Sequence, residues 1–247
     1  APVQTMGAAD SSFSDNLTDV VPGSGVYYKI KAKKNGEYYY EYQTVGHYYI
    51  ALRRALNLIS LPLVPGDSSL QTVLGDQFNG ATSYLDADKV HVYNPETGGY
   101  QTAWLYKGSN DVLNGKWLTQ SGLEESPLKI RTNESFWIEL TKNSVDTVFA
   151  FSGAVYADSV RAIRLHQGYN FVGTPFLVEV ELDSSGLVAS QVMTGGEFSA
   201  AADFLIEWDG DGRTFKRAWL FKKTGSALDG KFMHESGSGL TDIKFRP

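Results

Sequence analysis

NLISLP at residues 57–62 recurs as NFVGTP at residues 170–175, and this recurrence indicates how the chain is organised. The offset between the two copies is 113 positions, and three further blocks repeat at an offset of 115. These are DKVHVYN at 88–94 with DFLIEWD at 203–209, AWLYK at 103–107 with AWLFK at 218–222, and LKIR at 128–131 with IKFR at 243–246. Self-similar blocks in one order indicate a tandem duplication.

The two copies cover different lengths of the repeat. After Arg131 the first copy continues into SFWIEL at 135–140 and VFAFSG at 148–153, whereas the second copy reaches Pro247 where this tail would begin. Residues 22–30 (PGSGVYYKI) resemble residues 132–140, and residues 38–46 resemble the second part of the tail. We therefore expect four parts, listed in chain order: an N-terminal extension at 1–21, a tail half-module at 22–46, a complete β module at 47–156, and a second β module at 157–247 that lacks its own tail strands.

Within a module the sequence favours β structure. Residues 48–52 and 56–61 are rich in apolar, β-branched and aromatic side chains, and residues 89–106 alternate around a Gly-containing turn as a hairpin does. Residues 67–75 predict one short helix, with an Asp or Ser at its N-cap and a Gly at its end. We expect an all-β fold of two related sandwich-like or barrel-like modules, each with one short helix, the second completed by the N-terminal strand segment.

Composition excludes several classes of protein. The chain has 247 residues and a formal net charge of −6, which argues against nucleic acid as a partner. Its longest apolar run, residues 55–64, is broken by polar residues and Pro, and is shorter than the ~18–20 residues of a membrane span. The chain has no Cys, which removes disulfides and thiolate chemistry. Its first residues lack an initiator Met, a basic region and an apolar region, as after signal-peptide cleavage, so we expect a secreted, extracellular or cell-surface protein.

The repeated motif resembles a known type of module. LNLISLPL at 56–63 and GYNFVGTPF at 168–176 are similar to the GWNLISLPL modules of secreted bacterial and archaeal surface proteins. SGAVY at 152–156 and FWI at 136–138 fall where those modules have a GxV and a GFW strand. The resemblance covers residues 45–247 and implies export and β architecture. It implies no reaction, because such modules bring no catalytic residues to carry over.

Motifs for chemistry are incomplete. There is no Gly-x-Ser-x-Gly elbow, and none of the four His residues has a His at the matching position of the other copy. GSALDGK at 225–231 has the spacing of a phosphate-binding loop, but Phe232 stands where Ser or Thr should bind Mg²⁺. DGDG at 209–212 lacks the later ligands of a calcium loop. We therefore expect a non-enzymatic protein without catalytic, metal or cofactor-binding residues; a hydrolase or lyase without a recognisable motif is the enzymatic alternative.

The tryptophans give a second functional hypothesis. Trp104 and Trp219 occupy the same position in the two copies, and exposed aromatic rings can stack on sugars. The alternative function is therefore a carbohydrate-binding β module that uses these rings as a platform for glycans. It requires solvent-facing rings, whereas aromatic residues at strand positions more often belong to a core.

The strongest prediction concerns assembly. The C-terminal strand of the second copy would expose an unpaired edge, and the N-terminal segment has the alternating pattern to fill it. The residues involved are Val26, Tyr28 and Ile30 on one side and Lys244, Phe245 and Arg246 on the other. Residues 21–56 carry six basic and two acidic residues (net +4), and residues 165–247 carry eight and eleven (net −3). If the segment folds back, the chain is a closed, circularly permuted monomer. If it enters the next chain, the protein is a structural or surface subunit of an extracellular filament, assembled head to tail by β-strand complementation with itself as partner.

Overall fold

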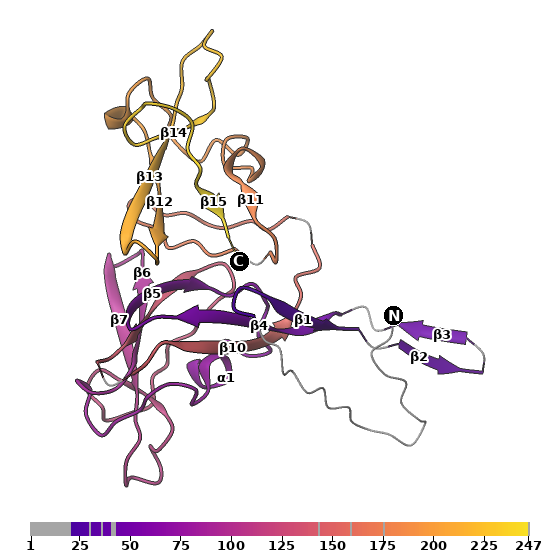
Figure 1. Cartoon of the computed structure of the whole chain (residues 1–247), viewed down its shortest axis with the longest axis vertical. Coiled ribbons are helices and arrows are strands. Elements are labelled where there is room, and N and C mark those ends of the chain that lie inside the picture. Colours follow the sequence, from indigo (N-terminus) through magenta and orange to yellow (C-terminus); the bar gives the residue numbers. More distant parts are fainter. Residues whose placement is uncertain are drawn as a thin grey trace.

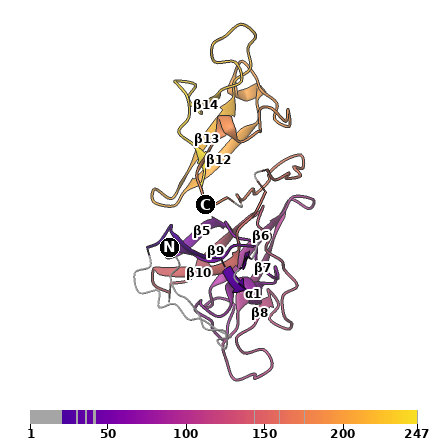
Figure 2. The same cartoon turned by 90° about the vertical axis from the view of Figure 1, so that its right-hand side faces the viewer.

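The computed structural model of the chain describes residues 21–29, 31–35, 37–40, 43–142, 144–158, 160–174 and 176–246. In this part of the chain strands predominate and pair only in antiparallel ladders, and α1 (Leu70–Leu74) is the single α-helix. The all-β fold predicted from the sequence is confirmed. Figures 1 and 2 show the second module, coloured orange to yellow, standing above the first.

The first module packs a larger sheet against a smaller one. The larger sheet has the order β5 (Ala55–Ser60), β9 (Ser135–Leu140), β6 (Lys89–Asn94), β7 (Gly99–Leu105), β8 (Trp117–Thr119), and the smaller has the order β1 (Gly25–Tyr28), β4 (Val45–Leu52), β10 (Thr147–Ala154). Nineteen buried residues form the core between them. The inward side chains of β9, Phe136, Ile138 and Leu140, all belong to this core because alternate strand residues face the same side.

The predicted helix of the first module is present. Helix α1 (Leu70–Leu74) begins after Ser69, whose side-chain oxygen accepts the Thr72 N–H at 3.3 Å. The helix ends at Gly75, which has a positive φ of 59°. It buries Leu70, Val73 and Leu74 against the core, so the cap and the apolar face both follow the sequence pattern.

The second module contains smaller sheets. β12 (Phe204–Asp209), β13 (Thr214–Leu220) and β14 (Phe232–His234) form one sheet, and β11 (Val180–Glu181) pairs with β15 (Lys244–Phe245). Its core cluster has five buried residues. The predicted second helix is wrong: the 3₁₀ turns Leu182–Ser184 and Ser199–Ala201 stand in this module instead. Gly186, with φ of 82°, follows the Asp-Ser-Ser sequence directly and interrupts the helical turn.

The NLISLP and NFVGTP motifs begin with the same local hydrogen bonds. The side-chain oxygen of Asn57 accepts the N–H of the residue four positions earlier at 2.9 Å, and Asn170 does the same at 2.8 Å. Each side-chain amide also donates to the carbonyl two positions earlier, at 3.0 Å in both copies. That earlier residue has a positive φ, 79° at Ala55 and 95° at Gly168. The same turn therefore precedes the NLISLP and NFVGTP motifs.

Aromatic side chains form part of the contact between the two modules. The ring of Trp137 on β9 packs edge-on against Trp208 on β12, with centroids 5.3 Å apart. Beside it, Glu134 forms a single antiparallel bridge with Val172. Gly173 lies so close that an added Cβ would stand 2.7 Å from the Ser60 Cβ and 2.8 Å from the Glu134 carbonyl oxygen. The NFVGTP motif of the second module is thus held against the larger sheet of the first.

The N-terminal segment does not complete the second module of its own chain. β1 pairs with β4, Gly25 opposite Tyr48 and Tyr28 opposite Val45, while β15 pairs with β11. Of the two alternatives, closure of the second module by the N-terminal segment of its own chain is therefore wrong, because this segment pairs with the edge of β4 instead. β2 (Lys31–Lys34) and β3 (Glu37–Tyr40) form a hairpin that projects from the body in Figure 1. Residues 1–20 and Ile30 lie outside the described residues.

Candidate functional site: the groove along β12

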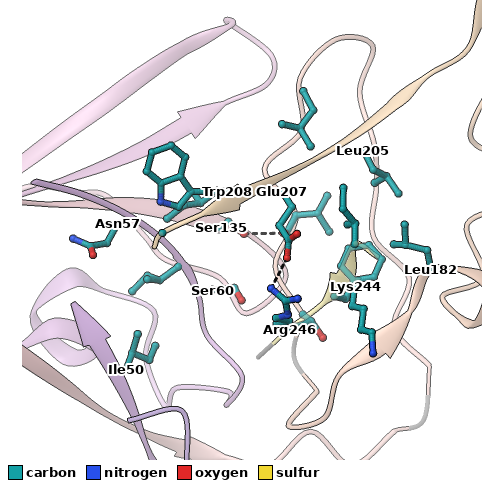
Figure 3. A pocket seen from close by; sticks show the side chains of 18 of the residues that line it. Ile50, Asn57, Ser60, Ser135, Leu182, Leu205, Glu207, Trp208, Lys244 and Arg246 are labelled. Carbon is teal, nitrogen blue, oxygen red and sulfur yellow. Dashed lines mark hydrogen bonds and ion pairs between the residues drawn. The ribbon is translucent and has the colours of Figure 1, made fainter. Parts of the chain in front are cut away.

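A groove of about 330 Å³ lies where the two modules meet. Its first-module wall comes from β4 and β5, with Ile50 and Ile59 among the lining residues. Its second-module wall comes from the Val172–Thr174 segment, β12 and residues 243–246. Figure 3 shows Glu207 and Arg246 facing each other in it, between Trp208 on one side and Leu182 and Leu205 on the other. We call it the β12 groove.

The β12 groove occupies a position that is filled by a strand in the first module. There β9 lies between β5 and β6, with Val90 opposite Ile138 on one side and Ile59 opposite Phe136 on the other. The counterparts of β6 and β5 in the second module are β12 and residues 170–174, and both line the groove. Among the described residues β12 pairs with β13 alone. The counterpart of β9 is what would fill the space between them.

The segments around the β12 groove are less regular than their first-module counterparts. Residues 160–165 correspond to residues 47–52 of β4, yet they form no strand, and Val160 is 77% exposed. Residues 170–174 correspond to β5 but make only the single bridge at Val172. In the first module β10 pairs with β4 and β9 pairs with β5. A strand forms where a neighbour supplies its ladder hydrogen bonds. Among the described residues, the segment 170–174 has such a neighbour only in residues 133–135, where Phe171 O accepts the Ser135 N–H at 3.2 Å and the Gly173 N–H donates to Asn133 O at 3.1 Å.

The floor of the β12 groove is apolar and only partly covered. Leu205 and Phe245 are half-buried against the second-module cluster, which includes Leu182 and Ile243. Val90, the counterpart of Leu205, is fully buried because Ile138 of β9 lies beside it. An apolar side chain entering from the groove would complete the second core in the same way.

One wall of the β12 groove contains unsatisfied polar atoms. Glu207 accepts a hydrogen bond from Arg246 Nη1 at 2.8 Å through Oε1, while its Oε2 is buried without a hydrogen-bond partner among the described residues. The indole N–H of Trp208 is unsatisfied in the same way. Burial raises the pKa of Glu207, with Asp242 and Asp209 adding to the effect and Arg246 and Lys216 opposing it. Buried polar groups are usually bonded, so Glu207 Oε2 is an exception among the described residues.

A second polar cluster lies on the outer face of the first module. His91 bonds Thr102 Oγ1 through Nδ1 at 2.9 Å and Glu139 Oε2 through Nε2 at 3.1 Å, and Lys89 Nζ lies 3.4 Å from Glu139 Oε1. These contacts link β7, β6 and β9 across the sheet. The second module has Ile206 at the position of His91, so the two copies do not share the cluster. Among the described residues there is also no group of three or more His, Asp or Glu that could hold a metal ion.

The two tryptophans proposed as a glycan platform are buried. Trp104 and Trp219 are each 4% exposed. Their indole N–H groups donate to the carbonyls of Thr119 at 2.8 Å and His234 at 3.1 Å. The alternative of a glycan platform requires solvent-facing rings, and neither ring meets this requirement, because both are buried core residues whose indole N–H bonds a neighbouring strand. The repeat alone could not distinguish a shared core from a shared ligand platform.

The predicted assembly residues lie on different parts of the chain. Val26 and Tyr28 stand on β1 beside β4, and Lys244, Phe245 and Arg246 line the β12 groove. Lys244 forms ion pairs with Glu179 and Glu181, and its hydrogen bond to Glu181 raises its pKa. The sequence reasoning missed the open edge of β12 itself. The signal was present in the offset of 115, which makes residues 203–209 the counterpart of the strand that pairs with β9.

No family model, no curated protein and no solved structure matches this chain. In the part of the chain that the structure describes, no helix is long and apolar enough to cross a membrane.

Proposed function

We propose that this chain is a non-enzymatic structural subunit that assembles head to tail by β-strand complementation, with an extended segment of one copy filling the β12 groove of the next. The observation that carries the proposal is the equivalence of the groove with the position of β9 in the first module. An inserted β-strand would supply the groove with two things, backbone hydrogen bonds and apolar cover. The edge of β12 needs backbone donors and acceptors, and the floor at Leu205 needs apolar cover.

The partner is a second copy of the same chain. Residues 22–46 carry four basic and two acidic residues (net +2), whereas residues 165–247 of the second module carry eight basic and eleven acidic residues (net −3). Opposite charges favour their encounter. Donor and acceptor lie on different surfaces of one molecule, so each copy can give a segment at one end and receive one at the other. Such a heterologous contact produces a filament unless the rotation closes a ring.

The proposed location is extracellular or on the cell surface. Its support is the resemblance of the NLISLP and NFVGTP motifs to modules of secreted surface proteins. Protease treatment of intact producing cells tests this location: a surface subunit is degraded while a cytosolic marker survives. Recovery of the protein in the protected fraction with that marker would contradict it.

Deleting the N-terminal segment tests the assembly. The 247-residue chain and a variant without residues 1–40, which keeps all of β4, are compared by light scattering and negative-stain electron microscopy. We expect long assemblies from the first and folded monomers from the second. A Leu205→Asp variant, which places a charge on the groove floor, should also stay monomeric. A full chain that remains monomeric at high concentration would overturn the proposal.

A further inference from the structure

We infer that the donor is the segment Gly25–Lys29 of a second copy, which enters the β12 groove in the register of β9, with Tyr28 opposite Leu205 and Tyr27 opposite Ile206. This inference rests on the proposed function, because it names the segment and the register of that assembly. Below, residues 25–29 are called the donor segment.

The donor segment matches β9 position by position. GVYYK at residues 25–29 aligns with SFWIE at residues 135–139 at an offset of 110. In β9, Phe136 and Ile138 face the core and are buried. The equivalent residues of the donor segment are Val26 and Tyr28, both large and apolar enough to cover a core. A register shift of one residue would turn Tyr27 and Lys29 inward instead, so the pattern selects one register.

The cross-strand residue pairs of β9 have counterparts in the second module at the offsets of the repeat. Val90 opposite Ile138 becomes Leu205 opposite Tyr28, and His91 opposite Trp137 becomes Ile206 opposite Tyr27. On the other side of the strand, Ile59 opposite Phe136 becomes Val172 opposite Val26. Leu205, Ile206 and Val172 all line the β12 groove. One inserted strand thus contacts both walls.

The polar wall of the groove matches the donor segment as well. Glu207 stands where the first module has Val92, and Tyr28 stands where it has Ile138. In the inferred register Glu207 is the diagonal, same-face neighbour of Tyr28, within reach of a long side chain. The Tyr28 hydroxyl therefore donates a hydrogen bond to Glu207 Oε2, the atom that is buried without a partner among the described residues. The apolar pair Val92 and Ile138 of the first module is thus replaced by the polar pair Glu207 and Tyr28, whose members come from two different molecules of the chain.

The carboxylate of Asp203 is placed to accept a hydrogen bond from the chain that follows the donor segment. In the first module Asp88 accepts the N–H of Thr141, the residue after β9, at 2.8 Å. Its counterpart Asp203 is exposed and accepts the Thr194 N–H at 2.6 Å. At the offset of 110, the backbone N–H of residue 31 falls beside this carboxylate. Asp203 thus supplies a hydrogen-bond acceptor just beyond the end of the groove.

In the isolated chain the donor segment is stored on β4 and must leave it. Four residue pairs hold β1 there, and none of its residues is buried. The Tyr27 ring lies over Gly46, since an added Cβ at Gly46 would stand 2.5 Å from Tyr27 Cδ1. Val26 and Tyr28 are only half-buried on β4, whereas the positions they take in the groove are buried core positions in the first module.

Disulfide trapping tests the register, because the chain has no Cys of its own. A Tyr27→Cys copy is mixed with an Ile206→Cys copy under mild oxidation. Directly opposite residues have Cβ atoms about 4.5–5.5 Å apart, close to disulfide geometry, and diagonal ones about 7–8 Å. We expect a covalent dimer from this mixture and little from Lys29→Cys with Ile206→Cys. Tyr27→Cys with Gly46→Cys in one chain reports the stored state, because those residues are opposite in β1 and β4.

Exchanging the polar pair tests the hydrogen bond. Tyr28→Phe should raise the critical concentration for assembly about tenfold, the usual worth of one hydrogen bond to a charged group. The double variant Tyr28→Ile with Glu207→Val recreates the first-module pair and should restore assembly relative to either single variant. Circular dichroism of each monomer checks folding. An unchanged critical concentration in Tyr28→Phe would overturn the hydrogen bond.

The outcomes separate the inference from the function on which it rests. Filaments that form while residues 27 and 206 fail to cross-link would overturn the donor segment or its register and leave head-to-tail assembly standing. A chain that forms no assemblies would overturn both. Cross-linking at 27 and 206 in the mixture, together with filaments, supports both.

Discussion

The two modules share their local structure and differ in their cores. The turn around Asn57 is reproduced around Asn170 with the same hydrogen bonds, and the indole N–H of Trp219 repeats the bond made by Trp104. Yet the first module buries nineteen residues in its main cluster and the second buries five. Turns and caps are thus specified within a few residues, whereas strands and cores depend on partners from far along the chain.

β9 and β10 account for much of this difference. Five residues of the first core, Phe136, Ile138, Leu140, Phe149 and Phe151, come from these two strands. Full burial of each such side chain contributes about 1.5–3 kcal/mol. The second module lacks this contribution in the isolated chain, so we expect it to unfold at a lower denaturant concentration than the first.

Truncating the β9 core should have the largest effect. Ile138 is fully buried, and Ile138→Ala should lower the free energy of unfolding of the first module by about 2–5 kcal/mol. Tyr28→Ala, at the equivalent position of the donor segment, should lower it by much less in the monomer, because Tyr28 is only half-buried on β4. Urea unfolding followed by tryptophan fluorescence measures both. Similar losses in the two variants would contradict the distinction between a permanent strand and a donated one.

Crowding Gly46 should release the stored segment. The Cβ of Gly46→Val would stand 2.5 Å from both the Tyr27 ring and the Val26 carbonyl oxygen, so β1 must move away from β4. We expect assembly to begin sooner, measured as a shorter lag in light scattering. Gly66→Val is the matched control, because an added Cβ there meets nothing within 4 Å. A longer lag in Gly46→Val would show that β1 on β4 does not compete with assembly.

The same substitution at Asn57 and at Asn170 compares how firmly the two modules hold equivalent turns. Asn57→Ala and Asn170→Ala remove equivalent hydrogen bonds, each worth about 0.5–1.5 kcal/mol. We expect the larger loss for Asn57, because β5 behind it is already fixed by β9, while the segment after Asn170 is irregular. Thermal unfolding of both variants gives the comparison. A larger loss at Asn170 would mean that its segment is as well fixed as β5.

The smallest expected effect is the pH dependence at Glu207. Its pKa is raised from the ordinary value of 4.5, chiefly by burial, so the folded chain binds this proton more tightly than the unfolded chain. Stability from this group is therefore present below pH 4.5 and is lost as pH rises through the raised value. Glu207→Gln should flatten this part of the pH profile, measured from urea midpoints. The exposed Glu125→Gln is the control, and equal flattening there would contradict the assignment.

Much of the fold follows from the sequence because the repeat supplies two examples of each element. The strands over residues 89–106, the cap at Ser69 and the all-β class all follow from alternation and turn residues. The second helix was predicted wrongly, because one inserted Gly186 outweighs the capping pattern.

The candidate site was harder to locate, because pairing between distant segments is not a local property. The alternation of Val26 and Tyr28 suits the edge of β4 and the edge of β12 equally, and the sequence does not rank the two. Burial of Trp104 was equally undetermined, since alternation shows that a side chain faces one side without showing which side is covered.

Gly173 has a consequence for shape. It stands where Ser60, Glu134 and the second module converge, with no room for a Cβ. Any side chain there must push the second module away from the first, and a small displacement at such a pivot becomes a large swing at the far tip. In a row of identical subunits the same swing recurs at every step in the same sense. This one position, between Val172 and Thr174 in the wall of the β12 groove, would therefore set the pitch and curvature of the whole row.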